Sequence, residues 1–148
     1  MREFKFRAWD GKKMCRIEQW NFRNPSGVGI RGSDGKGTYT EIKIPIMQYT
    51  GLTDKKGKEI YEGDICKIVD LFAGDEYEKF KHRLGLFGKI VYVNAAFEFE
   101  TLERGNELLF LDLLYENSGA DMSFEDSIDS DSLEVVGNIY ENPNLVKE

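Results

Sequence analysis

The feature that most constrains the fold is a series of short stretches in which apolar and polar side chains alternate. Residues 3–10 and 38–47 show this alternation, turn-forming residues lie between them, and residues 88–100 suit a further hairpin. A period of two places successive side chains on opposite faces of a strand, one buried and one solvated. The pattern therefore predicts a mostly β protein whose strands are joined by tight turns.

The N-terminal region is expected to begin with a hairpin. Residues 3–10 and 14–22 form its strands, and the segment "DGKK" supplies the turn. Residues 23–36 contain four glycines and one proline without periodicity, which predicts a mobile loop. Residues 38–47 alternate again with Ile42, Ile44 and Ile46 directed inward, and Pro45 indicates an edge strand or a bent strand.

The stretch "MQYTGLTDKKGKEIYEGDIC" (residues 47–66) contains the residue types that favour two tight turns. Asp54 can accept backbone N–H groups, and Gly57 can supply the positive φ that ends a hairpin loop. Gly63 suits a second tight reversal, with Asp64 bonding local amides. A phosphate-binding loop would need a GxxxxGK[ST] or GxGxxG pattern, which this stretch lacks, so we interpret it as turns.

The remainder is expected to form an SH3-like barrel. A short helix over 75–84 is inserted between strands, residues 94–96 form a hairpin tip, and residues 133–140 form a last strand. Residues 106–116 suit a buried strand or a helix, and we favour the strand. The predicted organisation is an N-terminal β portion (1–60) packed on the barrel with its acidic loop (61–148), as one compact unit.

Charge is divided unequally along the chain. Residues 1–60 hold 13 Lys and Arg against 7 Asp and Glu, a balance of +6, whereas residues 61–148 hold 7 against 20, a balance of −13. This division suggests that the basic part docks on acidic surface within one chain or between chains as a homo-oligomer. The alternative is a basic face that binds nucleic acid.

The 148 residues suffice for one ordinary domain with a proper core. Charges interrupt the first ten residues where a signal peptide would need an apolar segment, and the run "LLFLDLLY" is too short to span a bilayer. Cys15 and Cys66 fit no CxxC pattern, so we expect reduced, half-buried thiols rather than a disulfide. A soluble cytoplasmic protein without a membrane partner is the expectation.

No catalytic residue, metal site or cofactor is predicted. His82 is the single histidine and Cys66 its only plausible thiol partner, and we interpret His82 as a surface residue of the short helix. The acidic run with Asp126, Asp129, Asp131 and Glu134 departs from the spacing of a calcium-binding loop and is expected to be a solvated loop. A small metal-dependent hydrolase or nuclease with an unrecognised carboxylate site remains the alternative.

Basic and aromatic residues share the solvated face of the first predicted strand and recur on a later strand. Such a mixture suits nucleic acid, because cations meet phosphates and rings stack on bases. It suits protein docking equally, and the negative net charge of −7 favours docking. The candidate binding surface consists of Lys5, Arg7, Trp9, Tyr39 and Lys43.

Three blocks, residues 1–10, 47–65 and 134–145, resemble the YopX family of bacteriophage and prophage proteins. The resemblance implies a β-rich fold with an SH3-like barrel, a phage or prophage origin and a place in the bacterial cytoplasm. Because nucleophile–base, metal and cofactor signatures are missing, we expect an accessory protein that acts by binding an unknown host or phage protein. The resemblance implies no catalytic residue. The family-motif positions, which we interpret as structural, are Gln48, Tyr49, Thr50, Gly51, Gly57, Tyr61, Gly63 and Asp64.

Overall fold

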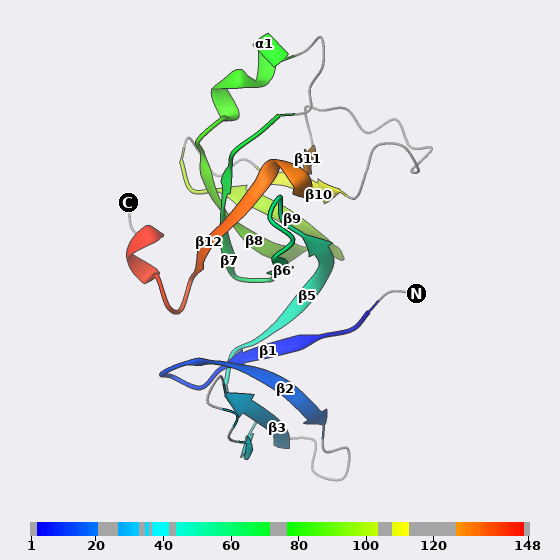
Figure 1. The fold of residues 1–148 in the computed structure, drawn as a ribbon, viewed down its shortest axis with the longest axis vertical. Coiled ribbons are helices and arrows are strands. Elements are labelled where there is room, and N and C mark those ends of the chain that lie inside the picture. Colours follow the sequence, from blue (N-terminus) through cyan, green and yellow to red (C-terminus); the bar gives the residue numbers. More distant parts are fainter. Residues whose placement is uncertain are drawn as a thin grey trace. The chain divides into compact units, whose positions relative to one another are not determined.

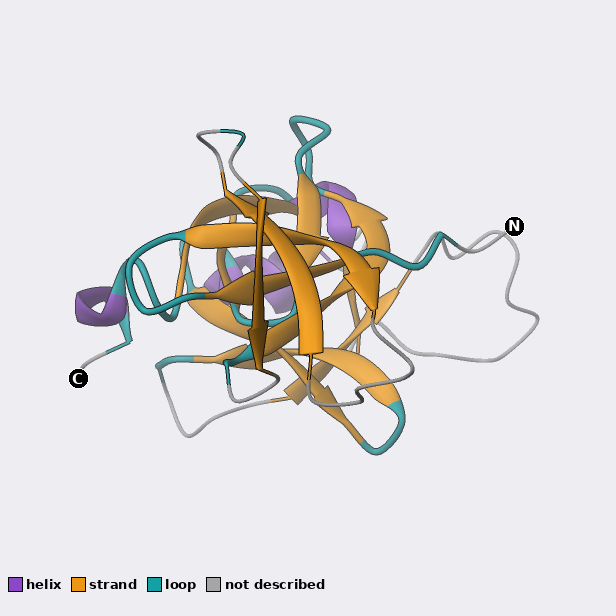
Figure 2. Cartoon of the chain, turned by 90° about the horizontal axis from the view of Figure 1, so that it is seen from below, coloured by secondary structure: helices purple, strands orange, loops and turns teal. Residues whose placement is uncertain are grey.

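The computed structural model describes residues 3–20, 27–32, 35, 37–41, 44–71, 77–103, 108–112 and 127–146 (Figure 1). The chain divides into two compact units, Met1–Tyr49 and Thr50–Glu148, with the division inside one strand. Strands dominate both units, and the helical segments are short (Figure 2). The predicted mostly β class is confirmed.

The first unit is an antiparallel sheet with the strand order β4-β3-β2-β1-β5. The predicted hairpin is confirmed: Ala8 lies opposite Cys15, and Trp9 lies opposite Met14. The strands that contribute are β1 (Phe6–Trp9), β2 (Met14–Trp20), β3 (Gly27–Gly32), β4 (Gly37–Glu41) and the beginning of β5 (Ile46–Thr53).

A small apolar cluster stabilises one face of this sheet. Ala8 is fully buried and Cys15 is 2% exposed, and the partly buried Ile17, Ile44 and Ile46 pack against them. The inward direction predicted for Ile44 and Ile46 agrees with this cluster, whereas Ile42 lies outside the described residues. The cluster thus contains Ala8 from β1 and Cys15 and Ile17 from β2.

Two predictions for this region are wrong. The supposed loop 23–36 contains strand β3, because its backbone pairs with β2 on one side and with β4 on the other. Glycine weakens a strand but does not prevent backbone pairing. Hydrogen bonds to both neighbouring strands therefore form β3 although its sequence lacks a periodic apolar pattern. The single strand expected over 38–47 is two strands, β4 and β5, which have different neighbours in the sheet.

The second unit contains the end of β5 and its hairpin partner, followed by a second sheet with the order β11-β10-β9-β8-β7-β12. Pairing is antiparallel except between β10 and β11, which run parallel. The strands are β6 (Glu59–Tyr61), β7 (Asp64–Ile68), β8 (Phe87–Val93), β9 (Ala96–Thr101), β10 (Leu108–Asp112), β11 (Ser127–Asp129) and β12 (Leu133–Asn138).

The core of the second unit is one cluster of buried aliphatic and aromatic side chains from β5 to β12. Phe99 on β9 lies at its centre, with no exposed surface. Gly88 on β8 faces this ring, since a Cβ at that position would lie against the ring carbons of Phe99. The cluster comprises Leu52, Ile60, Cys66, Ile68, Leu86, Ile90, Phe97, Phe99, Leu109, Ile128, Leu133 and Val135.

The helical and turn predictions for this unit are largely confirmed. Helix α1 (Tyr77–Phe80) continues into the 3-10 helix η2 (Lys81–Arg83), with Phe80 buried. Asn94 and Ala95 form the β8–β9 tip with positive φ angles of 50° and 63°, as a two-residue hairpin turn requires. The ambiguous stretch 106–116 contains strand β10. Two further 3-10 helices are η3 (Ser130–Ser132) and η4 (Pro143–Leu145).

The second sheet ends at β11 on one side and at β12 on the other, and no pair of described strands joins those two ends. The described residues therefore give two sheets and one short helix, and the closed SH3-like barrel stays a prediction. Residues 113–126, which hold most of the expected acidic loop, lie outside the described part of the chain.

Candidate functional site

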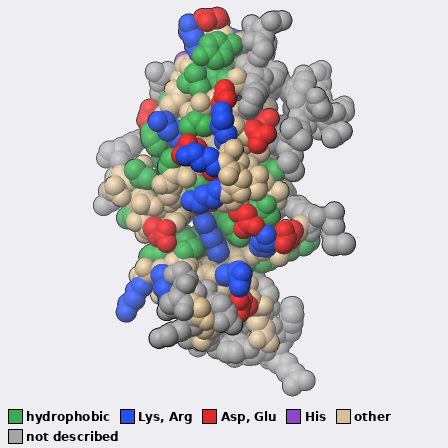
Figure 3. Space-filling view, viewed as in Figure 1, with side chains coloured by type: hydrophobic (Ala, Val, Ile, Leu, Met, Phe, Trp, Pro, Cys, Tyr) green, Lys and Arg blue, Asp and Glu red, His purple; other side chains and the backbone are tan. Residues whose placement is uncertain are grey.

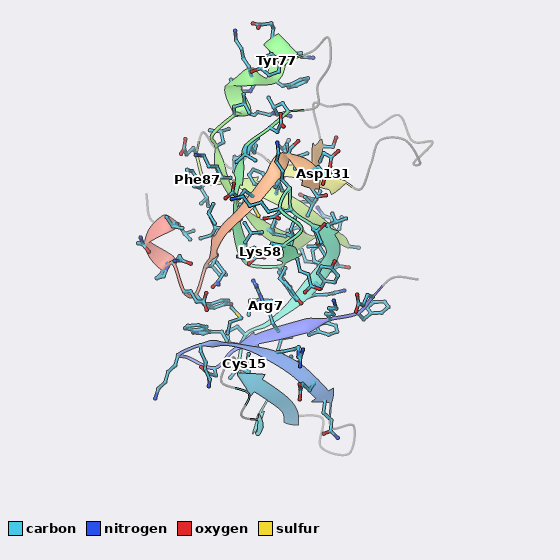
Figure 4. The ribbon with its side chains drawn as sticks, viewed as in Figure 1. Arg7, Cys15, Lys58, Tyr77, Phe87 and Asp131 are labelled. Carbon is cyan, nitrogen blue, oxygen red and sulfur yellow. The ribbon has the colours of Figure 1, made fainter. Side chains whose placement is uncertain are left out.

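Strand β1 places the first three predicted binding residues on one face of the first unit's sheet. Ala8 is directed into the apolar cluster, so the alternation directs Lys5, Arg7 and Trp9 to the opposite face. Arg7 lies opposite Arg16 on β2 and opposite Met47 on β5. Figure 4 labels Arg7 and Cys15, which belong to opposite faces of this hairpin.

We define the basic face as Lys5, Arg7, Trp9 and Arg16. The arginines are direct cross-strand partners, an arrangement that is destabilising for like charges. Arg16 donates to Glu18 at 2.7 Å from the same strand. Both arginines also interact with other groups of the chain, so intramolecular partners already accompany the positive charges of this face.

Exposure varies across the face that alternation predicts to be solvated. Lys5, Arg7 and Trp9 are only partly exposed, and Met47, on the β5 side, is 3% exposed. Arg16, on the β2 side, keeps 71% of its side chain exposed. Exposure on this face therefore decreases from β2 across β1 to β5.

Lys5 shows which chemical groups this face already accommodates. Its Nζ lies 3.2 Å from the Glu3 carboxylate and 5.2 Å from the centre of the Tyr49 ring. The backbone continues the pairing of β1 with β5, since Tyr49 N–H donates to the Lys5 carbonyl at 2.9 Å. A carboxylate and an aromatic ring are thus the neighbours of this ammonium group.

Of the other two predicted surface residues, only Tyr39 lies in a described strand. Strands β3 and β2 separate β4, which carries Tyr39, from β1, so three strand spacings of about 4.8 Å place their backbones roughly 14 Å apart. Lys43 lies outside the described residues. The register runs from Arg7 through Arg16 and Arg31 to Gly37, two residues before Tyr39. Tyr39 therefore has a register position on the same side of the sheet as Arg7, and its membership of the binding surface stays a prediction.

Sequence reasoning missed Arg16, although the signal for it was present. A hairpin with the turn "DGKK" fixes a register in which Arg7 faces Arg16, because the sum of paired positions is constant along the ladder. The same alternation on β2 places Glu18 beside Arg16. Reading the second strand against the first would have found both residues.

The family-motif residues at the end of β5 have structural roles. Thr50 is 7% exposed, and its hydroxyl donates to the Ile60 carbonyl at 2.8 Å and accepts the Leu52 N–H at 3.1 Å. Gly51 has φ of 90°, which favours glycine. Gln48 pairs opposite Phe6 in the first unit. These contacts give the three residues roles in maintaining the fold.

The turn between β5 and β6 is built as predicted. The Asp54 carboxylate accepts the N–H groups of Lys56 and Lys58, both at 2.9 Å, and Gly57 has φ of 81°. The other Asp54 oxygen accepts the N–H of Val135 on β12 at 2.9 Å. This last bond lies between segments that are distant in sequence, and local turn chemistry does not predict it.

The second predicted reversal is also confirmed. Gly63 has φ of 80°, and the Asp64 carboxylate accepts the Tyr61 N–H at 2.8 Å. The Gly63 N–H donates to the Ile90 carbonyl at 2.8 Å, and its carbonyl accepts the Ile139 N–H at 2.9 Å. The "YEGD" segment therefore connects β8 with the segment after β12.

Two lysines of the β5–β6 turn form exposed ion pairs. Lys55 lies 2.5 Å from Asp70 and lowers the pKa of that carboxyl through its hydrogen bond. Lys56 lies 2.6 Å from Glu134, and this hydrogen bond raises the pKa of the lysine above 10.5. On the face seen in Figure 3, basic side chains lie close to acidic ones. These lysines already have local partners.

The described residues offer no assembled catalytic or metal centre. His82 is exposed on η2, with Nδ1 2.9 Å from the Lys79 carbonyl. No disulfide joins Cys15 and Cys66, and with 2% and no exposed surface both are more deeply buried than predicted. No group of three or more described His, Cys, Asp or Glu residues is arranged to hold a metal ion.

Asp129 and Glu134, from the predicted acidic loop, have other roles. Asp129 accepts the Asp131 N–H at 2.9 Å and caps η3, and Glu134 bonds to Lys56. Asp126 lies outside the described residues. No helix among the described residues has the length and apolar character needed to cross a membrane.

Comparison with known proteins identifies relatives along nearly the whole chain. The family model described as YopX protein matches residues 5–147. The crystal structure of protein EF1440 from Enterococcus faecalis is similar, with 29% sequence identity and a TM-score of 0.56. That match covers 99% of this chain and 100% of the other. None of the curated proteins matches the chain.

Proposed function

We propose that this chain, which belongs to the YopX family, acts by binding an acidic protein surface through its basic face, without catalysing a reaction. The observation that carries the proposal is the cross-strand pair of Arg7 and Arg16. Two like charges held opposite each other cost stability, and carboxylates of a partner would offset that cost. The pair thus favours an anionic partner.

The environment of Lys5 favours protein over nucleic acid. Its neighbours are the Glu3 carboxylate and the Tyr49 ring, groups that a protein partner also presents. Nucleic acid would need exposed rings on which bases stack, but Trp9 is only partly exposed. The net charge of −7 adds repulsion toward phosphates.

Affinity capture from bacterial extract tests the proposal, with the immobilised chain and with nuclease added to half of the samples. We expect the wild type to retain acidic proteins whether or not nuclease is present. The double variant Arg7→Gln/Arg16→Gln should lose them, since it removes both positive charges while keeping long polar side chains. Circular dichroism establishes that each variant is folded.

Lys12→Gln is the matched control, because Lys12 is an exposed lysine of the β1–β2 turn outside the basic face. It should retain the same proteins as the wild type. Retention that disappears on nuclease treatment would assign the face to nucleic acid. Equal retention by wild type and double variant would exclude the basic face as the binding surface.

The biological setting that we propose is a phage or prophage accessory protein acting in the bacterial cytoplasm, as the YopX resemblance implies. Catalysis has its own test. A screen for hydrolysis of phosphoesters and nucleic acids, with and without magnesium, should give no turnover. Metal-dependent turnover abolished by a single Asp→Ala substitution would overturn the non-catalytic assignment.

We also propose that the second unit closes into an SH3-like barrel, with the β5–β6 turn covering the free edge of β12. Two hydrogen bonds support this proposal: Lys55 N–H donates to the Leu133 carbonyl at 2.9 Å, and Val135 N–H donates to Asp54. Hydrogen exchange tests it. The Lys55 and Val135 amides should be as protected as amides in β7, and rapid exchange of both would mean an open sheet.

A further inference from the structure

Strand β4 is the last strand at one side of the first unit's sheet among the described strands. It pairs with β3 from Gly37, opposite Arg31, to Glu41, opposite Gly27. The outer side of such a strand offers backbone N–H and C=O groups to another strand. Natural edge strands commonly block this pairing with lysine or proline, and β4 contains neither.

The sequence of β4, Gly-Thr-Tyr-Thr-Glu, is almost symmetric about Tyr39. If two copies pair antiparallel about this residue, Tyr39 faces its own counterpart and Thr38 faces Thr40 of the other copy. Glu41 then faces Gly37, so the two carboxylates are kept apart. Aromatic pairs and threonine pairs directly opposite each other are favourable cross-strand combinations.

Other antiparallel registers are poorer. A shift of one residue would place opposite faces of the two strands together, which breaks the alternation. A shift that pairs Glu41 with its counterpart sets two like charges opposite each other, which is destabilising. Only the register centred on Tyr39 uses all five residues of β4 and gives only favourable or neutral pairs.

We propose that a second copy of this chain pairs with β4 through the register centred on Tyr39, which extends the sheet across a two-fold axis. A two-fold axis requires the same patch to be complementary to itself, and the symmetric sequence of β4 meets that requirement. The contact is about 17 Å long for five residues, so we expect a weak, concentration-dependent dimer.

Pairing through β4 does not involve the basic face. The salt dependence of dimerisation should therefore differ from that of partner binding by the basic face. Residues 1–49 hold 10 Lys and Arg against 5 Asp and Glu, so two such units repel each other. Salt screens that repulsion and therefore leaves β4 pairing unchanged or strengthens it. Binding of an acidic partner to the basic face should weaken with salt instead.

Sedimentation equilibrium over a range of concentrations tests the inference on the full chain. The wild type should show a monomer–dimer equilibrium, and Tyr39→Phe should preserve it. Tyr39→Lys places two positive charges on the axis and should raise the dissociation constant by on the order of tenfold. A wild type that stays monomeric at every concentration would overturn the inference.

A charge-swap mixture controls against a folding defect. Tyr39→Lys and Tyr39→Glu should each dimerise more weakly than the wild type when alone. Mixed, they should form a heterodimer more readily than either pairs with itself, because opposite charges then face each other across the axis. If Tyr39→Lys dimerises like the wild type, or if the mixture of folded variants stays monomeric, β4 is not the interface. Arg7→Gln/Arg16→Gln should dimerise like the wild type, which separates this result from the test of the basic face.

Discussion

Asp54 and Val135 lie 81 positions apart in the sequence, yet the Asp54 carboxylate accepts the Val135 N–H at 2.9 Å. The same carboxylate orders its own turn through the N–H groups of Lys56 and Lys58. Asp54 is 3% exposed, so water cannot easily replace these bonds. One side chain thus fixes a hairpin turn and attaches it to the last strand.

Replacing Asp54 with alanine should therefore be costly. Asp54→Ala leaves the buried Val135 N–H without its acceptor, and we expect the free energy of unfolding to fall by about 3 kcal/mol. Urea denaturation measures the change. Asp10→Ala is the matched control, because Asp10 also accepts two turn amides but is exposed. Equal losses in both variants would show that the bond to β12 contributes nothing.

Gly88 should tolerate no side chain while Phe99 is present. A Cβ at Gly88 would lie 2.7 Å from one ring carbon of Phe99, and that ring has no exposed surface into which it can move. We expect Gly88→Ala to lower the free energy of unfolding by about 1–3 kcal/mol.

A double-mutant cycle identifies the ring as the cause of this loss. In a Phe99→Leu background the smaller side chain should make Gly88→Ala much less costly. Additive losses from the two substitutions would mean that the glycine is required for another reason.

Acid should remove the stabilising contribution of Asp10. Its pKa lies below the ordinary value of 3.8, because the Lys13 N–H and then the Lys12 N–H donate to the carboxylate. A lowered pKa in the folded state stabilises the fold above pH 3.8, and this contribution disappears as the pH falls through the folded value. NMR titration of the carboxyl carbon measures that pKa.

Asp10→Asn should reduce the acid dependence of stability, because the amide cannot ionise while its oxygen can still accept. An Asp10 pKa at or above 3.8 in the folded chain would contradict this account.

The sequence predicted the elements whose signals are local. Alternation located β1, and the turn chemistry of Asp54 and Gly63 was correct in detail. Strand β3 was missed because glycines at alternate positions leave only Val28 and Ile30 as a periodic signal. The bond from Asp54 to Val135 could not be predicted, since no local pattern encodes a partner so distant in the chain.

The candidate site was predicted in part. Alternation placed Lys5, Arg7 and Trp9 on one face, but it could not reveal how far that face is buried, which depends on neighbouring strands. Tyr39 was grouped with them from composition alone, and the intervening strands separate it from β1. Arg16 can be predicted as a member of this face only when the register of the hairpin is considered.

Parallel titrations of the chain with polyglutamate and with single-stranded RNA, across a range of salt concentrations, test the central claim most directly. If the basic face binds acidic proteins, the chain should bind polyglutamate. Arg7→Gln/Arg16→Gln should abolish this binding and Lys12→Gln should preserve it. RNA should not bind at physiological salt. The contrary result is RNA binding that falls log-linearly with salt and requires the same two arginines, because counterion release would then identify phosphates as the ligand.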